Sequence, residues 1–340
     1  MIPQTLRKGQ GFILIAIVFL LIVAFSMRKY DLMPYEGYLD QYPARTSPNL
    51  YPTDSTSLPS KIWQIFSTPA DAKEKPSDSI NPKALGDAAS WVGLNPGYQY
   101  KLLGAGTTSG DDFVIKHFSH DKTIMDTYFS LRSPGLKTDL LRYLILWIEG
   151  GVYADLDTWA IKPIDVWVPE HLRAEGRVKA VVGLEWDQLD GEPWPGFGNE
   201  PSYMTHVVQF CQWTFAATPG HPLLENAIQT SVKRIAALAT AKNASISELD
   251  PNGYEVVTTT GPSAWTDVVF EQLRKVDPKF RSLKELSGMK ESRLIGDILV
   301  LTIDGFGMGQ PHSHSTSGGS IPDAALAKHG FRHSWLPNIS

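Results

Sequence analysis

The feature that most constrains this chain is a predicted helix that stops at two glycines. It leads into a short predicted strand with two aspartates at its end. The segment SPGLKTDLLRYLILWIEGGVYADLD covers residues 133–157. Ser133 and Pro134 are typical of a helix start, and Gly150 and Gly151 are typical of a helix stop. The apolar residues that follow predict a strand. The two glycines also predict a tight passage of the backbone between helix and strand, which is a structural role.

Strand and helix patterns alternate along the rest of the chain. Short apolar runs rich in β-branched and aromatic residues predict strands at 61–66, 98–103, 178–185, the first part of 206–218, and 296–303. Amphipathic patterns predict helices near 84–92, at 221–241 and at 261–276. This alternation favours an α/β fold. The sequence contains no Walker A motif and no internal repeat.

A charged pair lies roughly opposite the apolar stripe of the predicted helix. At about 100° per residue, one face carries the apolar side chains Leu141, Leu144, Ile145 and Ile148. Asp139 and Arg142 are three residues apart and share the other face. We therefore expect this pair to face a cleft or solvent. An ordinary ion pair on the helix surface is the alternative.

Asp155 and Asp157 form an Asp-x-Asp sequence directly after the predicted strand. Because the chain curls where a strand ends, both carboxylates can point to one place. Hard divalent cations prefer oxygen ligands and often share them between protein and substrate phosphates. The pattern thus predicts a metal and diphosphate site, with a solvated acidic turn as the alternative.

The N-terminus carries a long apolar segment. Residues 9–27 contain no charged side chain and are long enough to span a thin bilayer as a helix. The following segment lacks a small-residue cleavage site and turns basic at once, which favours an uncleaved signal-anchor over a cleaved signal peptide or a soluble apolar N-terminus. The predicted organisation is a cytosolic tail (1–8), a transmembrane signal-anchor (9–27), a stem rich in Pro, Tyr, Ser and Thr (28–57) and one folded luminal domain (58–340).

Charge and cysteine content exclude several classes of function. Four of the 31 basic side chains lie in residues 1–30, where no acidic side chain occurs, so the rest of the chain has 27 basic against 36 acidic residues and a net charge of −9. With no basic tract, nucleic acid is not expected as a partner. Cys211 is the only cysteine, which excludes an intramolecular disulfide and a zinc site built from cysteines.

The segment TDLLRYLILWIEGGVYADLDT resembles the sugar-binding signature of the family 32 glycosyltransferases, which include the initiating α-1,6-mannosyltransferases of fungal N-glycan outer chains. Four further segments resemble the same family in the same order: LPSKIWQIF, QFCQWTFAATPGHPLL, TTGPSAWTD and GFGMGQPHSHSTSG. Several ordered segments are more specific than one motif. The resemblance covers most of the predicted luminal domain.

The resemblance implies a GT-A type nucleotide-sugar transferase fold, with a mixed, mostly parallel sheet flanked by helices, behind the single transmembrane helix. It implies a single-pass type II protein of the Golgi membrane that transfers mannose, with retention of configuration, from GDP-mannose to N-linked glycans in α-1,6 linkage. The implied cofactor is Mn²⁺ or Mg²⁺. A complex with other Golgi mannosyltransferases is a further expectation. Inositol phosphoceramide is the alternative acceptor, and a non-catalytic glycan-binding module is the alternative function.

The resemblance also assigns residues. Asp155 and Asp157 match the metal and diphosphate motif, and Asp139 and Arg142 match the helix pair that contacts the donor sugar. Tyr153 belongs to the same motif as a donor-binding residue or a core residue. In the tail, His312 or His314 is expected to supply a metal ligand or a diphosphate contact, with His312 favoured because Pro311 stiffens its approach.

Other candidates carry weaker signals. Glu185, at the end of its predicted strand, is a candidate to reach the cleft. Trp213 and Trp265 suit either stacking on a sugar or the core, and His206 is expected to be structural. No residue has the spacing of a covalent nucleophile, which favours a front-face displacement. Two sequons, at Asn243 and Asn338, are usable only in a luminal domain.

Overall fold

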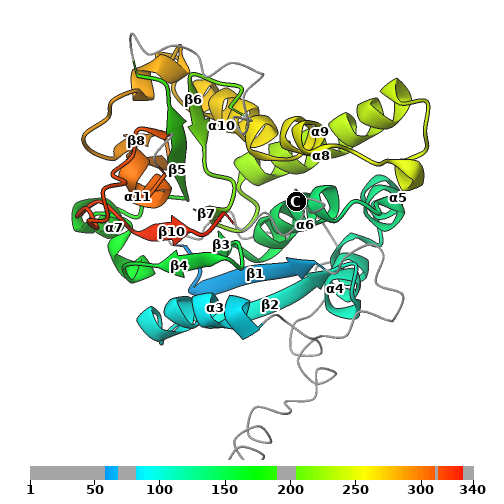
Figure 1. The fold of residues 1–340 in the computed structure, drawn as a ribbon, viewed down its shortest axis with the longest axis horizontal. Coiled ribbons are helices and arrows are strands. Elements are labelled where there is room, and N and C mark those ends of the chain that lie inside the picture. The colour runs from blue at the N-terminus through cyan, green and yellow to red at the C-terminus, as the bar shows by residue number, and fades with distance from the viewer. Residues whose placement is uncertain (1–57, 68–81, 190–203, 311–312, 332–340) are drawn as a thin grey trace, which may run out of the picture. The chain divides into compact units, whose positions relative to one another are not determined.

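The computed structural model describes residues 58–67, 82–189, 204–310 and 313–331 (Figure 1). The predicted cytosolic tail, transmembrane segment and stem lie outside these residues, as do His312 and Asn338. Within the described ranges, no helix combines the length and apolar character needed to cross a bilayer.

A mixed sheet of eight strands forms the centre of the described residues. Its order is β2-β1-β3-β7-β5-β9-β8, and β6 pairs with β5 off this path. The pairings place β1, β2, β3, β5 and β9 in one direction and β6, β7 and β8 in the other. The prediction of a mixed, mostly parallel sheet is therefore confirmed. The strands are β1 Lys61–Ser67, β2 Gln99–Ala105, β3 Gly151–Ala154, β5 Ala180–Asp187, β6 Val208–Phe210, β7 Thr214–Ala217, β8 Arg293–Ile295 and β9 Ile298–Leu301.

Helices cover both faces of this sheet (Figure 1). The α-helices in the described ranges are α3 Pro82–Leu94, α4 Thr108–Phe118, α5 Lys122–Ser130, α6 Pro134–Glu149, α7 Glu170–Ala174, α8 Pro222–Ala241, α9 Gly253–Thr259, α10 Pro262–Val276 and α11 Ile303–Gly307. Short 3-10 turns lie at Ile164–Val166, Ile246–Glu248 and Leu283–Leu286. The helices predicted near 84–92, at 134–149, at 221–241 and at 261–276 are all present.

Side chains that alternate along each strand divide the core into two layers. On one face, Trp63 of β1 and Tyr153 of β3 join the apolar sides of α4, α5, α6, α8 and α10. On the other face, Ile62 and Val152 join Trp91 of α3 and Phe306 of α11. The central strands are buried on both sides, which explains why their sequences read as nearly continuous apolar runs.

A second, two-stranded sheet brings the C-terminal part of the chain to the Asp-x-Asp segment. Strand β4, Thr158–Ala160, pairs antiparallel with β10, Ala327–His329, and His329 lies opposite Thr158. Figure 1 shows β10 running alongside β4 at the front of the domain. A segment from the middle of the folded domain therefore meets one from its C-terminal part.

Two glycines make the passage from α6 into β3. Gly150 and Gly151 have φ angles of 60° and 100°, a region that side chains disfavour. A Cβ atom on Gly151 would lie 2.5 Å from the backbone oxygen of Lys61, and one on Gly150 would lie 2.5 Å from Cδ of Pro219. The predicted tight passage is confirmed. Pro134 opens α6 as expected, whereas Ser133 precedes it without a side-chain capping bond.

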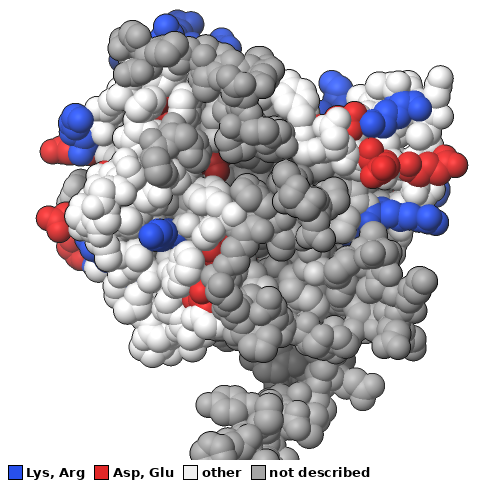
Figure 2. All heavy atoms as spheres, in the orientation of Figure 1, with Lys and Arg blue, Asp and Glu red and all other residues white. Residues whose placement is uncertain are grey.

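Charged side chains on the described part of the face drawn in Figure 2 gather mainly at its edges. Acidic and basic groups alternate there, and only a few charged groups lie near the centre. The described residues on this face therefore form no continuous basic stripe.

Candidate active site

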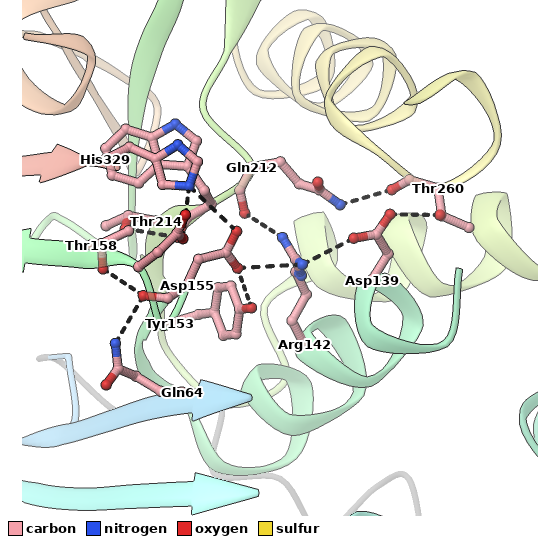
Figure 3. A network of polar contacts seen from close by, with 12 residues as sticks. Gln64, Asp139, Arg142, Tyr153, Asp155, Thr158, Gln212, Thr214, Thr260 and His329 are labelled. Atoms are coloured by element: carbon pink, nitrogen blue, oxygen red, sulfur yellow. Dashed lines mark hydrogen bonds and ion pairs between the residues drawn. The ribbon is translucent and has the colours of Figure 1, made fainter. Parts of the chain in front are cut away.

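Arg142 connects helix α6 to the end of strand β3 (Figure 3). Its Nη2 lies 3.0 Å from Oδ1 of Asp139 and 3.4 Å from Oδ1 of Asp155, and its Nη1 donates to the backbone oxygen of Gln212 at 3.1 Å. Asp139 and Arg142 are each only 5% exposed. Of the two surroundings expected for this pair, a cleft or solvent, open solvent is therefore excluded, and the alternative of an ion pair on the helix surface is wrong because the pair is buried. The pair is internal because α6 is buried nearly all round.

Asp139 is held by the turn between α9 and α10 as well as by Arg142. The hydroxyl of Thr260 donates to Oδ2 of Asp139 at 2.7 Å. Gln212 donates to the backbone oxygen of Thr260 and to the hydroxyl of Tyr143, both at 2.9 Å. Burial raises the pKa of Asp139, and Arg142 and Thr260 offset part of that rise. Asp139 thus orients Arg142 toward Asp155.

Tyr153 is both a core residue and a partner of the Asp-x-Asp segment. Its ring is fully buried, lies beneath the guanidinium of Arg142 at 4.6 Å and packs against Phe215. Its hydroxyl donates to Oδ1 of Asp155. The two roles considered for Tyr153 are therefore compatible, because one end of the ring is apolar and the other is polar.

The backbone of Asp155 is fixed on both sides. Its N–H donates to the oxygen of Trp213 at 2.8 Å, and its oxygen accepts from Nε2 of Gln64 at 2.8 Å and from Oγ1 of Thr158 at 2.6 Å. The hydroxyl of Tyr100 in turn holds Oε1 of Gln64 at 2.7 Å. Sequence reasoning missed Gln64, although a polar residue inside the buried run of β1 was a detectable signal.

His329 completes a group of three ligand-type side chains with the two aspartates. Its Nε2 lies 3.0 Å from Oδ1 of Asp157 and 4.0 Å from Oδ2 of Asp155. One candidate ligand atom from each residue falls within 4.8 Å of the others. The imidazole is stacked on Trp213, with ring centroids 4.9 Å apart and planes 9° apart, so its direction is set. Figure 3 shows the ring above Asp155.

Of the two tail histidines named from the sequence, only His314 lies within the described residues, and it is not one of the three members of this group. His312 lies outside the described residues. His314 contacts the backbone oxygen of Asp187 through Nδ1, and its ring packs against Trp186. Within the described residues, the histidine that the C-terminal part of the chain supplies to the aspartates is His329. No local pattern marks it, because the contact depends on the pairing of β10 with β4.

The group is rich in negative charge. Asp139 and Asp155 flank the guanidinium of Arg142, Asp157 lies beside His329, and burial raises the pKa of Asp155 despite Arg142 and His329. Two carboxylates and an imidazole are a donor set that suits Mn²⁺, and Mg²⁺ less well because of the nitrogen ligand. The residues present therefore fit the divalent cation that the sequence predicts.

The remaining candidates separate into neighbours of the site and core residues. Trp213 packs against His329, while Trp265 stacks on Tyr143 and packs against Phe215 in the core. The two nitrogens of His206 bind Thr205 and Asp267, which agrees with a structural role.

Comparison with known proteins supports the resemblance found in the sequence. A family model described as "Glycosyltransferase sugar-binding region containing DXD motif" matches residues 84–174. The initiation-specific α-1,6-mannosyltransferase of Candida albicans is 30% identical over 330 residues, which are 91% of this chain and 79% of that protein. The chain belongs to this glycosyltransferase family. The region matched by the family model contains Asp139, Arg142, Tyr153, Asp155 and Asp157, whereas His329 lies beyond it.

Two further proteins are similar to parts of this chain. The initiation-specific α-1,6-mannosyltransferase of Schizosaccharomyces pombe is 31% identical over 280 residues, and the chain covers 82% of its own length and 64% of that relative. Among solved structures, the PaToxG glycosyltransferase has a TM-score of 0.41 and 15% sequence identity, over 66% of this chain and 73% of that chain.

Proposed function

We propose that this family member is a metal-dependent glycosyltransferase that moves mannose from GDP-mannose to an oligosaccharide acceptor. The observation that carries the proposal is the group formed by Asp155, Asp157 and His329. The names of the two fungal relatives support mannose as the sugar and an α-1,6 linkage. A GT-A type of fold and retention of the sugar's configuration are part of the proposal.

In this proposal, Asp155, Asp157 and His329 hold Mn²⁺ or Mg²⁺. When bound, the cation neutralises charge on the leaving diphosphate. Arg142 and the hydroxyl of Tyr153 orient Asp155 and offset part of the rise in its pKa that burial causes. The backbone bonds from Gln64 and Thr158 hold the turn in one conformation, which limits reorganisation when the donor binds.

Asp139 and Arg142 are proposed to border the donor sugar. Nη1 and Nη2 of Arg142 are engaged by Gln212, Asp139 and Asp155, but its Nε has no hydrogen-bond partner within the described chain. A buried N–H of this kind is costly unless a ligand satisfies it. We propose that Nε of Arg142 donates a hydrogen bond to the bound nucleotide sugar. We also propose that His312 contacts the diphosphate from the tail.

The experiment for this proposal uses the purified full-length chain in detergent. It is incubated with Mn²⁺ and a panel of nucleotide sugars, and the released nucleoside diphosphate is measured. Turnover of GDP-mannose above the other sugars is the expected result. Turnover of UDP-glucose with none of GDP-mannose would overturn the mannosyl assignment. Loss of turnover with a chelator, and its recovery with Mn²⁺, tests the metal.

The acceptor is proposed to be an N-linked glycan, with inositol phosphoceramide as the alternative. Transfer assays with a mannose-rich N-glycan and with inositol phosphoceramide, each supplied with the same donor, distinguish the two. A product on the lipid alone would refute the glycan assignment.

We further propose that the domain lies in the Golgi lumen as a type II membrane protein. The sequon at Asn243 follows helix α8 and is exposed, so an oligosaccharide can be attached there without disturbing the core. An endoglycosidase-sensitive mobility shift that disappears in Asn243→Gln supports a luminal domain. An unmodified Asn243 in the natural host would count against it.

A further inference from the structure

Glu185 is a buried carboxyl that is not a member of the group formed by Asp155, Asp157 and His329. It lies near the end of β5, where only 6% of the residue is exposed. Burial raises its pKa to about 7. Within the described chain, no lysine or arginine forms an ion pair with it. An acidic side chain in such a place is costly unless hydrogen-bond donors compensate for the lost water.

The surroundings of Glu185 place it on the same site as Asp155 and His329. The indole of Trp213 lies beside the Glu185 carboxyl and stacks on the His329 imidazole with ring centroids 4.9 Å apart, and Asp155 and His329 are both near enough to change the pKa of Glu185. The segment that follows β6 connects β5 with the Asp-x-Asp segment. The N–H of Cys211 donates to the oxygen of Gly183 in β5 at 2.8 Å, and the oxygen of Trp213, two residues further along, accepts from the N–H of Asp155. Glu185 therefore approaches the site from a different strand than Asp155.

A fixed amide orients this carboxyl. Gln209 is fully buried on β6 and donates from Nε2 to Oε2 of Glu185 at 3.2 Å. Oε1 of Gln209 accepts from the backbone N–H of Thr205 at 3.3 Å, and because that N–H can only donate, the amide has one orientation. The hydroxyl of Thr205 is tied in turn to Ser263 of α10 at 2.7 Å. Gln209 and the indole of Trp213 are the hydrogen-bond partners that lower the pKa of Glu185, and because a carboxylate has about four acceptor positions, others stay able to accept from a ligand.

We propose that Glu185 binds a hydroxyl group of the sugar substrate and that Gln209 positions it for this contact. The inference rests on the proposed glycosyltransferase function of the site. Sugars present many hydroxyl donors, and a carboxylate is a strong acceptor for them. A hydroxyl of the donor sugar and a hydroxyl of the acceptor sugar share this chemistry.

The test compares the full-length wild type with Glu185→Gln, which keeps the size of the side chain and replaces an acceptor oxygen by an NH₂ donor. The donor panel first identifies the nucleotide sugar that the wild type uses, and the variants are measured with that sugar. A different donor would overturn the mannosyl assignment without affecting the inference on Glu185. If no nucleotide sugar is turned over, the proposed function fails, and weaker binding of a mannose oligosaccharide by Glu185→Gln then decides for or against the contact.

Three readouts distinguish the outcomes: affinity for the nucleoside diphosphate with Mn²⁺, donor hydrolysis without acceptor, and transfer. We expect the nucleoside diphosphate to bind Glu185→Gln within about twofold of wild type, because it carries no sugar. We expect kcat/KM to fall roughly 10- to 100-fold, as for the loss of one hydrogen bond to a charged group. A fall in both hydrolysis and transfer assigns the contact to the donor sugar, and a fall in transfer alone assigns it to the acceptor.

Two results would overturn the inference. One is unchanged hydrolysis and transfer in Glu185→Gln. The other is a parallel loss of nucleoside diphosphate binding in a variant that still unfolds at the wild-type temperature, because Glu185 would then support the metal group instead. Gln209→Leu tests the positioning role and should impair the same step as Glu185→Gln, while Glu185→Asp should recover part of the loss.

The matched control is Glu255→Gln. Glu255 is an acidic side chain that caps helix α9 and pairs with Lys242. Its replacement should leave all three readouts within about twofold of wild type, which separates a contact with the sugar from a general effect of removing a carboxylate. If Glu185→Gln does not fold, the Gln209→Leu and Glu185→Asp variants carry the test, because they change the contact without removing the carboxyl.

Discussion

Nε2 of His329 lies 3.0 Å from Oδ1 of Asp157, although roughly half of the chain separates the two residues. The antiparallel pairing of β10 with β4 makes this contact, and stacking on Trp213 fixes the imidazole. The relationship turns an acidic turn into a three-residue donor set.

His329→Ala should weaken Mn²⁺ binding by at least about tenfold, since the imidazole would be one of three protein ligands. The measurement is a Mn²⁺ titration monitored by calorimetry, in the presence of nucleoside diphosphate. His314→Ala is the matched control, because His314 contacts the oxygen of Asp187 instead. Equal losses in the two variants would show that His314 also reaches the metal, as the sequence predicted.

Tyr153→Phe should lower the free energy of unfolding by about 1 kcal/mol, the usual size of one lost hydrogen bond, while the ring keeps its contact with Arg142. The variant should also bind Mn²⁺ less tightly, because Asp155 loses one of its two orienting partners. Chemical denaturation and metal titration measure the two effects. An unchanged metal affinity would limit Tyr153 to a core role.

The stability of Glu185→Gln relative to wild type should depend on pH in the absence of metal. The folded-state pKa of Glu185 is about 7 and its ordinary value is 4.5, so the folded protein holds this proton more tightly than the unfolded chain. The contribution of this proton to wild-type stability is therefore lost as pH rises from about 4.5 to about 7. Glutamine does not titrate, so the variant shows no such loss. The difference in unfolding free energy should shift in favour of the variant over this range, by about 3 kcal/mol at most. Denaturant unfolding at several pH values with a chelator measures it, and a difference independent of pH would contradict the raised pKa.

Gly151→Ala should destabilise the fold by roughly 1–3 kcal/mol or more, because its φ of 100° and the approach of the Lys61 oxygen leave no room for a methyl group. Gly86→Ala in helix α3 is the control, since a Cβ atom there meets nothing within 4 Å. The control should be neutral or stabilising by up to about 1 kcal/mol. Thermal unfolding of both variants checks the pair, and equal behaviour would mean that the turn relaxes around alanine.

Features that depend on neighbouring residues were predictable. The start of α6 at Pro134, its stop at Gly150 and the strand that follows are set by backbone preferences and by the apolar pattern, which act over a few residues. The same holds for Asp155 and Asp157, since a strand end followed by two carboxylates is visible in the sequence itself. The family signature then added Asp139 and Arg142 to the candidate site.

The surroundings of these residues were not predictable. The sequence places Asp139 and Arg142 opposite an apolar stripe, yet helix α9, helix α10 and the β6–β7 segment cover that face and bury the pair. Glu185 gained its raised pKa in the same way, through burial beside β6.

The sequence by itself determined the α/β class, the helix–glycine–strand passage and the two aspartates, because each depends on local preference and periodicity. The tertiary structure alone decided that His329 joins those aspartates, that Gln64 fixes their turn and that Arg142 lies inside the domain. The physical reason is that strand pairing and helix packing bring together residues from distant parts of the chain, and the local pattern around each residue carries no record of its partner.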